Sequence, residues 1–262
     1  MISHHPKKYL MEIMSYKNLL FSLVSREIYG KYKNSKIGFG WNVASPIIIL
    51  LTYCIIFSVL KTADVDNLWI YITTALFPFY FMINNFSNGT MCIVNNSNMV
   101  KKMYFPREII VISHIISTGL IFLINYCIAL AVIVISGHLI TWHIILLPLA
   151  MLAMVSFTYG YTLIFSSINV YIRDLGYLIQ SISFLFYFIT PIYFTVENNS
   201  LLYWITMLNP FSYYIDLFRD LIYWNIMPDI TTTIVIAIIS IITPIFGTII
   251  FKHLKKGFAE RL

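Results

Sequence analysis

The stretch IIVISHIISTGLIFLINYCIALAVIVIS, residues 109–136, decides the fold class. It contains no Asp, Glu, Lys or Arg. A helix of about 20 apolar residues crosses the roughly 30 Å of hydrocarbon in a bilayer. Inside lipid the backbone must satisfy its own hydrogen bonds, which a helix does. The stretch therefore predicts a transmembrane helix.

Five further stretches share this length and lack of charge, at 39–60, 68–90, 144–168, 175–195 and 230–251. The whole chain is 59% hydrophobic and 11% charged, whereas a soluble domain carries about 25% charged residues. The second stretch is the least apolar, since its far end contains Asn84, Asn85, Ser87 and Asn88. We expect that end to face protein or water. Together the stretches predict an all-α membrane protein with six transmembrane helices in one domain, residues 1–262.

The basic residues predict the orientation of these helices. Fifteen of the 17 Lys and Arg residues lie before the first stretch, between the second and third, between the fourth and fifth, or after the last. Lys61 and Arg219 are the two on the other side. Basic residues near transmembrane helices accumulate in the cytoplasm. Both termini are therefore predicted to be cytoplasmic, and the net charge of +6 is a topology signal.

Two segments outside these stretches are still apolar on one face. Residues 16–33 place Tyr16, Leu20, Val24, Ile28 and Tyr32 at helical spacing, which predicts an amphipathic helix in the cytoplasmic interface; a basic membrane anchor is the alternative. Residues 196–229 are broken at Asn209-Pro210 and predict two short re-entrant helices on the outer side. A cap packed against the other helices is the alternative there.

Motifs for catalysis or metal binding are not evident. Gly30-Lys31 lacks the glycine spacing of a phosphate-binding loop, and the three cysteines show no disulfide or zinc pattern. Ion-coupled carriers need ionisable groups within the membrane, but the six stretches offer only His114. If the protein transports a substrate, we expect another subunit to supply the energy.

Aromatic residues make up 17% of the chain, and two of the stretches contain clusters of them. Aromatic rings stack on the C–H faces of sugars, and tyrosine hydroxyls bind sugar hydroxyls. A substrate path is therefore a hypothesis for the following residues, with ordinary helix packing as the alternative: Tyr71, Phe77, Tyr80, Phe184, Tyr187 and Tyr193.

Several blocks of sequence resemble the permease subunit of bacterial ABC transporters that export polysaccharides, the O-antigen and teichoic-acid type within the ABC-2 group. The blocks are KYKNSKIGFGW (31–41), NNSNMVKKMYFPREI (95–109), NVYIRDL (169–175), PIYF (191–194), LNPF (208–211) and GFAERL (257–262). The resemblance covers nearly the whole chain, and the block at 95–109 is the most specific. One difference is Ser45-Pro46 where the family is closer to Asn-Pro.

The resemblance implies a homodimer in the bacterial inner membrane that pairs with two copies of a cytoplasmic ATPase. ATP and Mg²⁺ would bind that partner, so this chain would be neither an enzyme nor a metal protein. The implied cargo is a lipid-linked glycan, with O-antigen first and teichoic acid or capsule next. A drug or lipid permease, or a membrane glycosyl- or acyltransferase, are further alternatives. Nucleic acid is not an implied partner.

The resemblance also implies roles for particular residues. An interface helix would include Arg26, Glu27, Lys31 and Tyr32. The segment that couples to the ATPase would include Met99, Val100, Lys101, Lys102, Met103, Tyr104, Phe105, Arg107 and Glu108. We expect this segment to form a basic and apolar knob with Tyr104 and Phe105 exposed. Pro106 disfavours helix at the preceding residue, so the knob should end before the third transmembrane helix begins.

Overall fold

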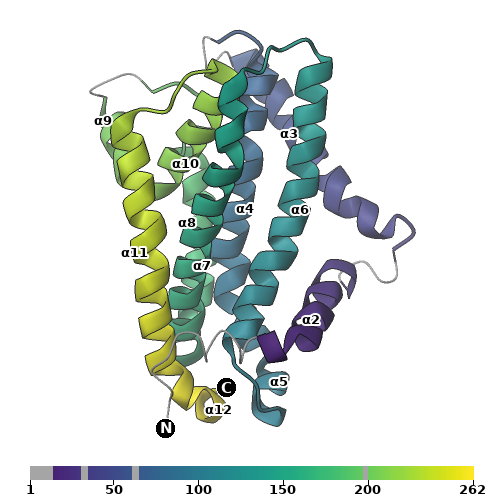
Figure 1. Cartoon of the computed structure of the whole chain (residues 1–262), viewed down its shortest axis with the longest axis vertical. Coiled ribbons are helices and arrows are strands. Elements are labelled where there is room, and N and C mark those ends of the chain that lie inside the picture. Colours follow the sequence, from purple (N-terminus) through teal and green to yellow (C-terminus); the bar gives the residue numbers. More distant parts are fainter. Residues whose placement is uncertain (1–13, 31–34, 61–64, 197–199) are drawn as a thin grey trace.

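The computed structural model describes residues 14–30, 35–60, 65–196 and 200–262, which form helices and no strands. The helices stand side by side along the long axis of the molecule (Figure 1). Lys31 and Tyr32, two predicted interface residues, lie outside the described residues.

Four helical segments of the described chain are long and apolar enough to cross a membrane. They are Gly38–Leu60, which contains α3 (Trp41–Leu60), α6 (Glu108–Ile135), Trp142–Tyr171, which contains α7 (Leu147–Tyr171), and Ile230–Arg261, which contains α11 (Ile230–Leu254). They coincide with the predicted stretches at 39–60, 109–136, 144–168 and 230–251.

The other two predicted stretches are also helical, but they differ from the prediction. α4 (Leu68–Asn95) is long but less apolar, and most of its residues are buried. α8 (Asp174–Ile189) has 16 residues, about 24 Å of helix, and stops before the predicted end at 195. Pro191 forces the preceding Thr190 into an extended conformation, with φ −83° and ψ 131°. The helix therefore cannot continue.

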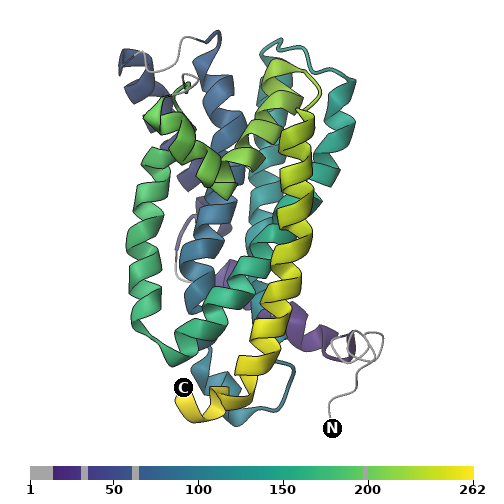
Figure 2. The same cartoon turned by 90° about the vertical axis from the view of Figure 1, so that its left-hand side faces the viewer.

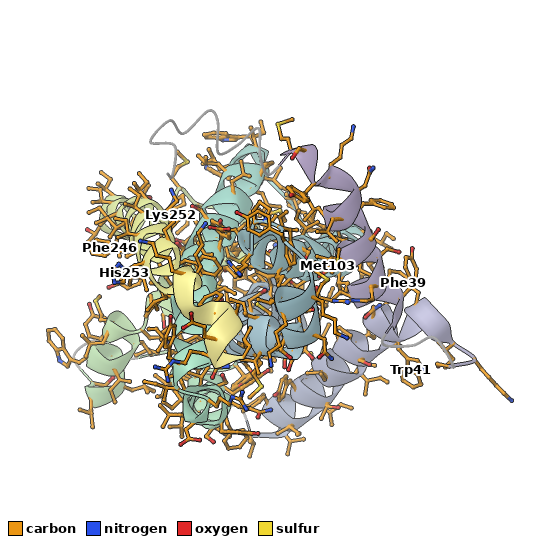
Figure 3. The ribbon with its side chains drawn as sticks, turned by 90° about the horizontal axis from the view of Figure 1, so that it is seen from below. Phe39, Trp41, Met103, Phe246, Lys252 and His253 are labelled. Carbon is orange, nitrogen blue, oxygen red and sulfur yellow. The ribbon has the colours of Figure 1, made fainter. Side chains whose placement is uncertain are left out.

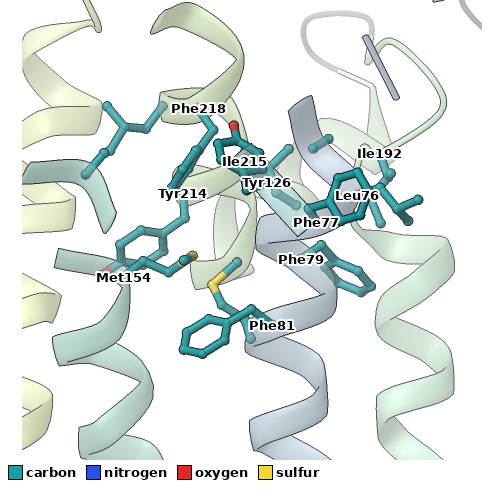
Figure 4. Packing of buried hydrophobic residues seen from close by; sticks show 14 of the residues in the cluster. Leu76, Phe77, Phe79, Phe81, Tyr126, Met154, Ile192, Tyr214, Ile215 and Phe218 are labelled. Atoms are coloured by element: carbon teal, nitrogen blue, oxygen red, sulfur yellow. The ribbon is translucent and has the colours of Figure 1, made fainter. Parts of the chain in front are cut away.

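α4 lies among the other helices and is in contact with α6, α7, α8, α3 and α10. Figure 4 shows aromatic residues of several helices in this core, among them Phe79 of α4, Tyr126 of α6, and Tyr214 and Phe218 of α10; the rings of Tyr126 and Phe218 lie edge-on, 5.5 Å apart. These four residues are at most 1% exposed. The asparagine-rich end of α4 faces protein at Asn85, which is fully buried and accepts a hydrogen bond from Thr118 of α6, whereas Asn88 is exposed.

α7 and α11 approach each other closely at two glycines. A Cβ added to Gly160 would lie 2.4 Å from the backbone nitrogen of Pro244, and one added to Gly247 would lie 2.4 Å from the carbonyl oxygen of Gly160. Small residues of this kind allow membrane helices to pack backbone to backbone. Figure 2 shows these two helices side by side.

The segment between α8 and α11 contains α9 (Leu201–Leu208), α10 (Pro210–Arg219) and the π-helical turn η3 (Asp220–Trp224). The predicted break at Asn209 is confirmed, because its side chain caps α10 by accepting a hydrogen bond from the N–H of Phe211. α9 is largely exposed, whereas α10 packs against α4, α7 and α11. The second half of this segment is therefore part of the bundle core.

Three short helices gather at the opposite end of the molecule (Figure 1). They are α2 (Lys17–Gly30), α5 (Ser97–Lys102) and α12 (Phe258–Arg261). α2 buries Leu23, Val24 and Ile28 and packs against α6. Its predicted apolar stripe thus contacts protein in this structure.

Candidate functional site

The segment 95–109 folds as a short helix followed by an extended turn. α5 ends at Lys102, Met103 is extended with φ −126° and ψ 142°, and α6 begins at Glu108. The prediction that the knob ends before the third transmembrane helix is confirmed. Figure 3, seen from this end, shows Met103 close to α5 and Trp41 at the edge where α3 begins.

The side chains of this segment divide into an exposed and a buried set. Lys101 and Lys102 are exposed, Met103 is 52% exposed and Tyr104 is 91% exposed. Val100, Phe105 and Glu108 are buried, and Met99 and Arg107 are half-buried. The expected exposure of Phe105 is wrong. Its ring belongs to the buried cluster that contains Phe251 and Phe258, so it anchors the turn that Tyr104 presents.

The C-terminal block GFAERL and the residues just before it pack against the segment 95–109 and the end of α7. Phe258 is fully buried in the same cluster as Phe105. Lys255 Nζ lies 2.6 Å from Oε1 of Glu108, whose side chain is 2% exposed. Arg173 donates to the carbonyl oxygen of Leu262 at 3.2 Å. The sequence did not reveal this support, because the partners are separated by up to 147 positions.

α2 is joined to α4 and α6 by polar contacts from two predicted interface residues. Arg26 donates to the side chain of Asn96. Glu27 pairs with Nδ1 of His114 and accepts a 2.8 Å hydrogen bond from Ser117. Burial acts to raise the pKa of Glu27, but the hydrogen bonds from His114 and Ser117 and the nearby charge of Arg26 outweigh it and hold the pKa below its ordinary value. His114 is therefore a hydrogen-bonded histidine.

A cavity of about 530 Å³ lies between α2, α3, α4 and α6. Asparagines, Trp41, Tyr80 and the Glu27–His114 pair are among the residues that line it. Asn88 and Asn95 are exposed, so the cavity opens to the surface. The signal in the sequence was the group of asparagines in the second apolar stretch, but their partners on α3 and α6 could not be read from it.

The six aromatic residues of the hypothetical substrate path fall in several places. Phe77 and Tyr80 line the cavity. Tyr193 is buried and stacks on Phe57 of α3, with ring centroids 4.2 Å apart. The others are distributed as follows: Tyr187 packs edge-on against Phe79, Tyr71 lies beneath Arg219 at the end of the bundle opposite α5, and Phe184 is 64% exposed. Within one copy of the chain they do not form one continuous surface.

Asp216, Arg219 and Asp220 gather at the end of the bundle opposite α5, around a second cavity of about 330 Å³. Arg219 is 4% exposed and lies 3.4 Å from Asp216. It also donates to the carbonyl oxygen of Pro191 at 2.7 Å and covers the ring of Tyr71 at 3.8 Å. The guanidinium therefore ties the turn after α8 to α10 and α4. In the described part of the chain, no three His, Cys, Asp or Glu residues are placed to hold a metal ion.

Comparisons with known proteins agree with this architecture over most of the chain. Residues 18–223 match the family described as ABC-2 type transporter. The chain is 26% identical to the O-antigen export system permease protein RfbA of Myxococcus xanthus over 96% of this chain and 98% of that one. It is 28% identical to the RfbA permease of Klebsiella pneumoniae over 94% and 95%. It is 24% identical to the capsule polysaccharide export inner-membrane protein CtrC of Neisseria meningitidis over 74% of each.

The family match spans the segment from α2 to η3, and therefore includes the segment 95–109, the cavity, α9 and α10. The four helical segments long and apolar enough to cross a membrane are consistent with a permease. The chain belongs to the ABC-2 type transporter family.

Proposed function

We propose that this chain is the transmembrane subunit of an ATP-driven exporter that moves a lipid-linked polysaccharide, O-antigen first among the candidates, across the bacterial inner membrane. The observation that carries the proposal is the exposed knob at the end of the bundle. It combines Lys101, Lys102, Met103 and the 91% exposed Tyr104 in a chain that aligns almost end to end with O-antigen export permeases.

The geometry of the knob suits docking to a soluble partner. An exposed aromatic ring with basic neighbours offers both apolar area and charge, and aromatic residues dominate the energy of many interfaces. The buried Phe105 and the Glu108–Lys255 pair hold the turn on the bundle. A motion of a docked ATPase would thus be transmitted to the first turn of α6 and to α11.

The proposal includes an orientation and an assembly. Six membrane-crossing helices, with α4 and α8 as the second and fifth, would place both termini and the knob in the cytoplasm. α8 is too short to cross alone, so the extended chain after Ile189 and the outer helices would complete its passage. Two copies of the chain would pair with two copies of an ATPase, which would bind ATP and Mg²⁺. α2 would lie in the cytoplasmic interface.

Single substitutions in the knob test this docking. Tyr104→Ala should reduce co-purification of the ATPase subunit about tenfold or more, the effect of losing one well-packed interface aromatic. It should leave the thermal stability of the permease unchanged, since the ring is exposed. Tyr177→Ala removes an exposed tyrosine of α8 and is the matched control. Full co-purification from the Tyr104 variant would contradict the proposed coupling role.

Export itself is tested in a strain that lacks the chain. Surface O-antigen should disappear while lipid-linked glycan accumulates in the inner membrane, because synthesis precedes transport. Loss of the lipid-linked glycan as well would favour an enzyme instead. Capsule export is the second candidate, supported by the match to CtrC. Loss of capsule with normal O-antigen in the deletion strain would establish it in place of the first.

A further inference from the structure

The cavity between α2, α3, α4 and α6 contains buried polar atoms that have no hydrogen-bond partner within the described part of the chain. They are Nδ2 of Asn42, Nε2 of His114 and Oδ1 of Asn125. The three residues line the cavity and are at most 9% exposed. A polar group withdrawn from water destabilises the fold unless it gains a partner. These three atoms are closed off from the open space, so the polar occupant is indicated by the amide and hydroxyl side chains that line the cavity, among them Asn84, Asn88 and Ser117.

The lining indicates what kind of polar occupant fits. Six side-chain amides face the cavity, those of Asn42, Asn84, Asn88, Asn95, Asn96 and Asn125. An amide both donates and accepts hydrogen bonds, as does a hydroxyl group. The rings of Trp41 and Tyr80 also line the cavity, and aromatic faces pack well on C–H groups. Amides together with aromatic rings match a sugar, which has hydroxyls at its rim and C–H groups on its faces.

The charge of the side chains that line the cavity indicates whether its ligand is an uncharged sugar or an anionic phosphate group. Arg26 and Glu27 are the charged side chains that line the cavity, and their charges are opposite. Arg26 is bonded to Asn96, and Glu27 to His114 and Ser117. Phosphate groups are bound by clusters of cations or by a bidentate Arg. The balanced lining instead favours an uncharged ligand.

The size and position of the cavity fit a sugar unit of the cargo. Its volume of about 530 Å³ lies within the range of about 300–1,000 Å³ for ligand sites. It extends from Asn96, next to α5, to Phe77 in the middle of α4. We infer that this cavity binds an uncharged sugar unit of the exported glycan inside a single copy of the chain. The inference rests on the proposed function and assigns it a site.

Photocrosslinking in native membranes tests the inference on the full complex. Benzoylphenylalanine replaces Asn88, which lines the open side of the cavity, or Ile128, which is exposed on α6 away from it. The expected result is a glycan-bearing adduct at position 88, about tenfold above position 128. The adduct should vanish in a strain that cannot start glycan synthesis. An adduct with phospholipid alone at position 88, or equal glycan adducts at both positions, would overturn the inference.

A substitution provides the second measurement. Asn88→Leu should lower the rate of surface glycan appearance about tenfold, the effect of one lost hydrogen bond to the ligand, and Asn88→Gln should restore part of it. Asn18→Leu, at an exposed asparagine of α2 outside the cavity, is the control. Normal export by the Asn88→Leu variant would refute the site. Normal export by the strain lacking the whole chain would refute the proposed function, so the two failures are distinguishable.

Discussion

Replacing Lys255 by Met would leave the carboxylate of Glu108 without its partner. The Glu108 side chain is 2% exposed, and its second oxygen has no hydrogen bond in the described structure. Removal of one member of a buried ion pair costs about 3–5 kcal/mol, because the remaining charge is neither solvated nor paired. We expect Lys255→Met to lower the free energy of unfolding by that amount.

Replacing the other member of the pair, Glu108, should lower the free energy of unfolding by less. The Lys255 side chain is 21% exposed, so its ammonium can reach water once Glu108 is replaced by glutamine. Glu108→Gln also retains an oxygen that can accept from Lys255, and we expect a loss of about 1–2 kcal/mol. The double variant removes both charges and should be about 2 kcal/mol more stable than Lys255→Met alone. This asymmetry follows directly from the unequal burial of the two side chains.

Equilibrium unfolding in mixed micelles, followed by the fluorescence of the five tryptophans, measures these differences. Lys256→Met is the matched control, since Lys256 is exposed and next in sequence. It should change the free energy of unfolding by less than about 0.5 kcal/mol. If Lys255→Met is no more destabilising than Glu108→Gln, or if the double variant shows no recovery, Glu108 is not held as a buried ion and the reasoning fails.

Four further substitutions, one of them a control, test the helix packing and the end of the bundle opposite α5. Gly247→Ala should lower the free energy of unfolding by at least about 2 kcal/mol, because the new Cβ would lie 2.4 Å from the backbone of α7. Gly119→Ala is the control and should be tolerated, since its new Cβ would lie 3.9 Å from the nearest atom. Thermal unfolding in detergent compares the two variants. Burial, and then nearby negative charge, raises the pKa of Asp220 to about 7. The folded state therefore binds the Asp220 proton more tightly than the unfolded state does. This proton's contribution to the free energy of unfolding is complete below about pH 4 and is lost as the pH rises through 7. Asp220→Asn should therefore reduce the difference between the unfolding temperatures at pH 5 and pH 8. Arg219→Lys should lower the free energy of unfolding by about 2 kcal/mol, since a lysine cannot both stack on Tyr71 and reach the two carbonyl oxygens that the guanidinium binds. An unchanged unfolding temperature would show that this end of the bundle does not depend on the guanidinium.

Local features of the sequence were sufficient to predict most of the helices. The length of each apolar stretch sets where a helix can cross lipid, and this depends on neighbouring residues only. The break at Asn209-Pro210 and the turn at Pro106 follow from the same local logic, because proline restricts the residue before it. The early end of α8 at Ile189 could have been read from Pro191 in the same way.

The candidate sites required contacts between distant residues. Phe105 is buried in a cluster that brings together distant residues, among them Phe251 and Phe258, so its expected exposure was wrong. Glu27 and His114 are 87 positions apart, and hydropathy contains no information about which polar residues meet.

The sequence by itself determined that this is a helical membrane protein with a basic knob at one end, since composition and spacing follow from the solvent that each residue faces. Only the tertiary structure decided which knob residues project, which charged pairs hold them and where a polar cavity opens. The physical reason is that the burial and pairing of side chains arise when packing brings distant residues together. The separation of two residues along the chain does not predict whether they meet.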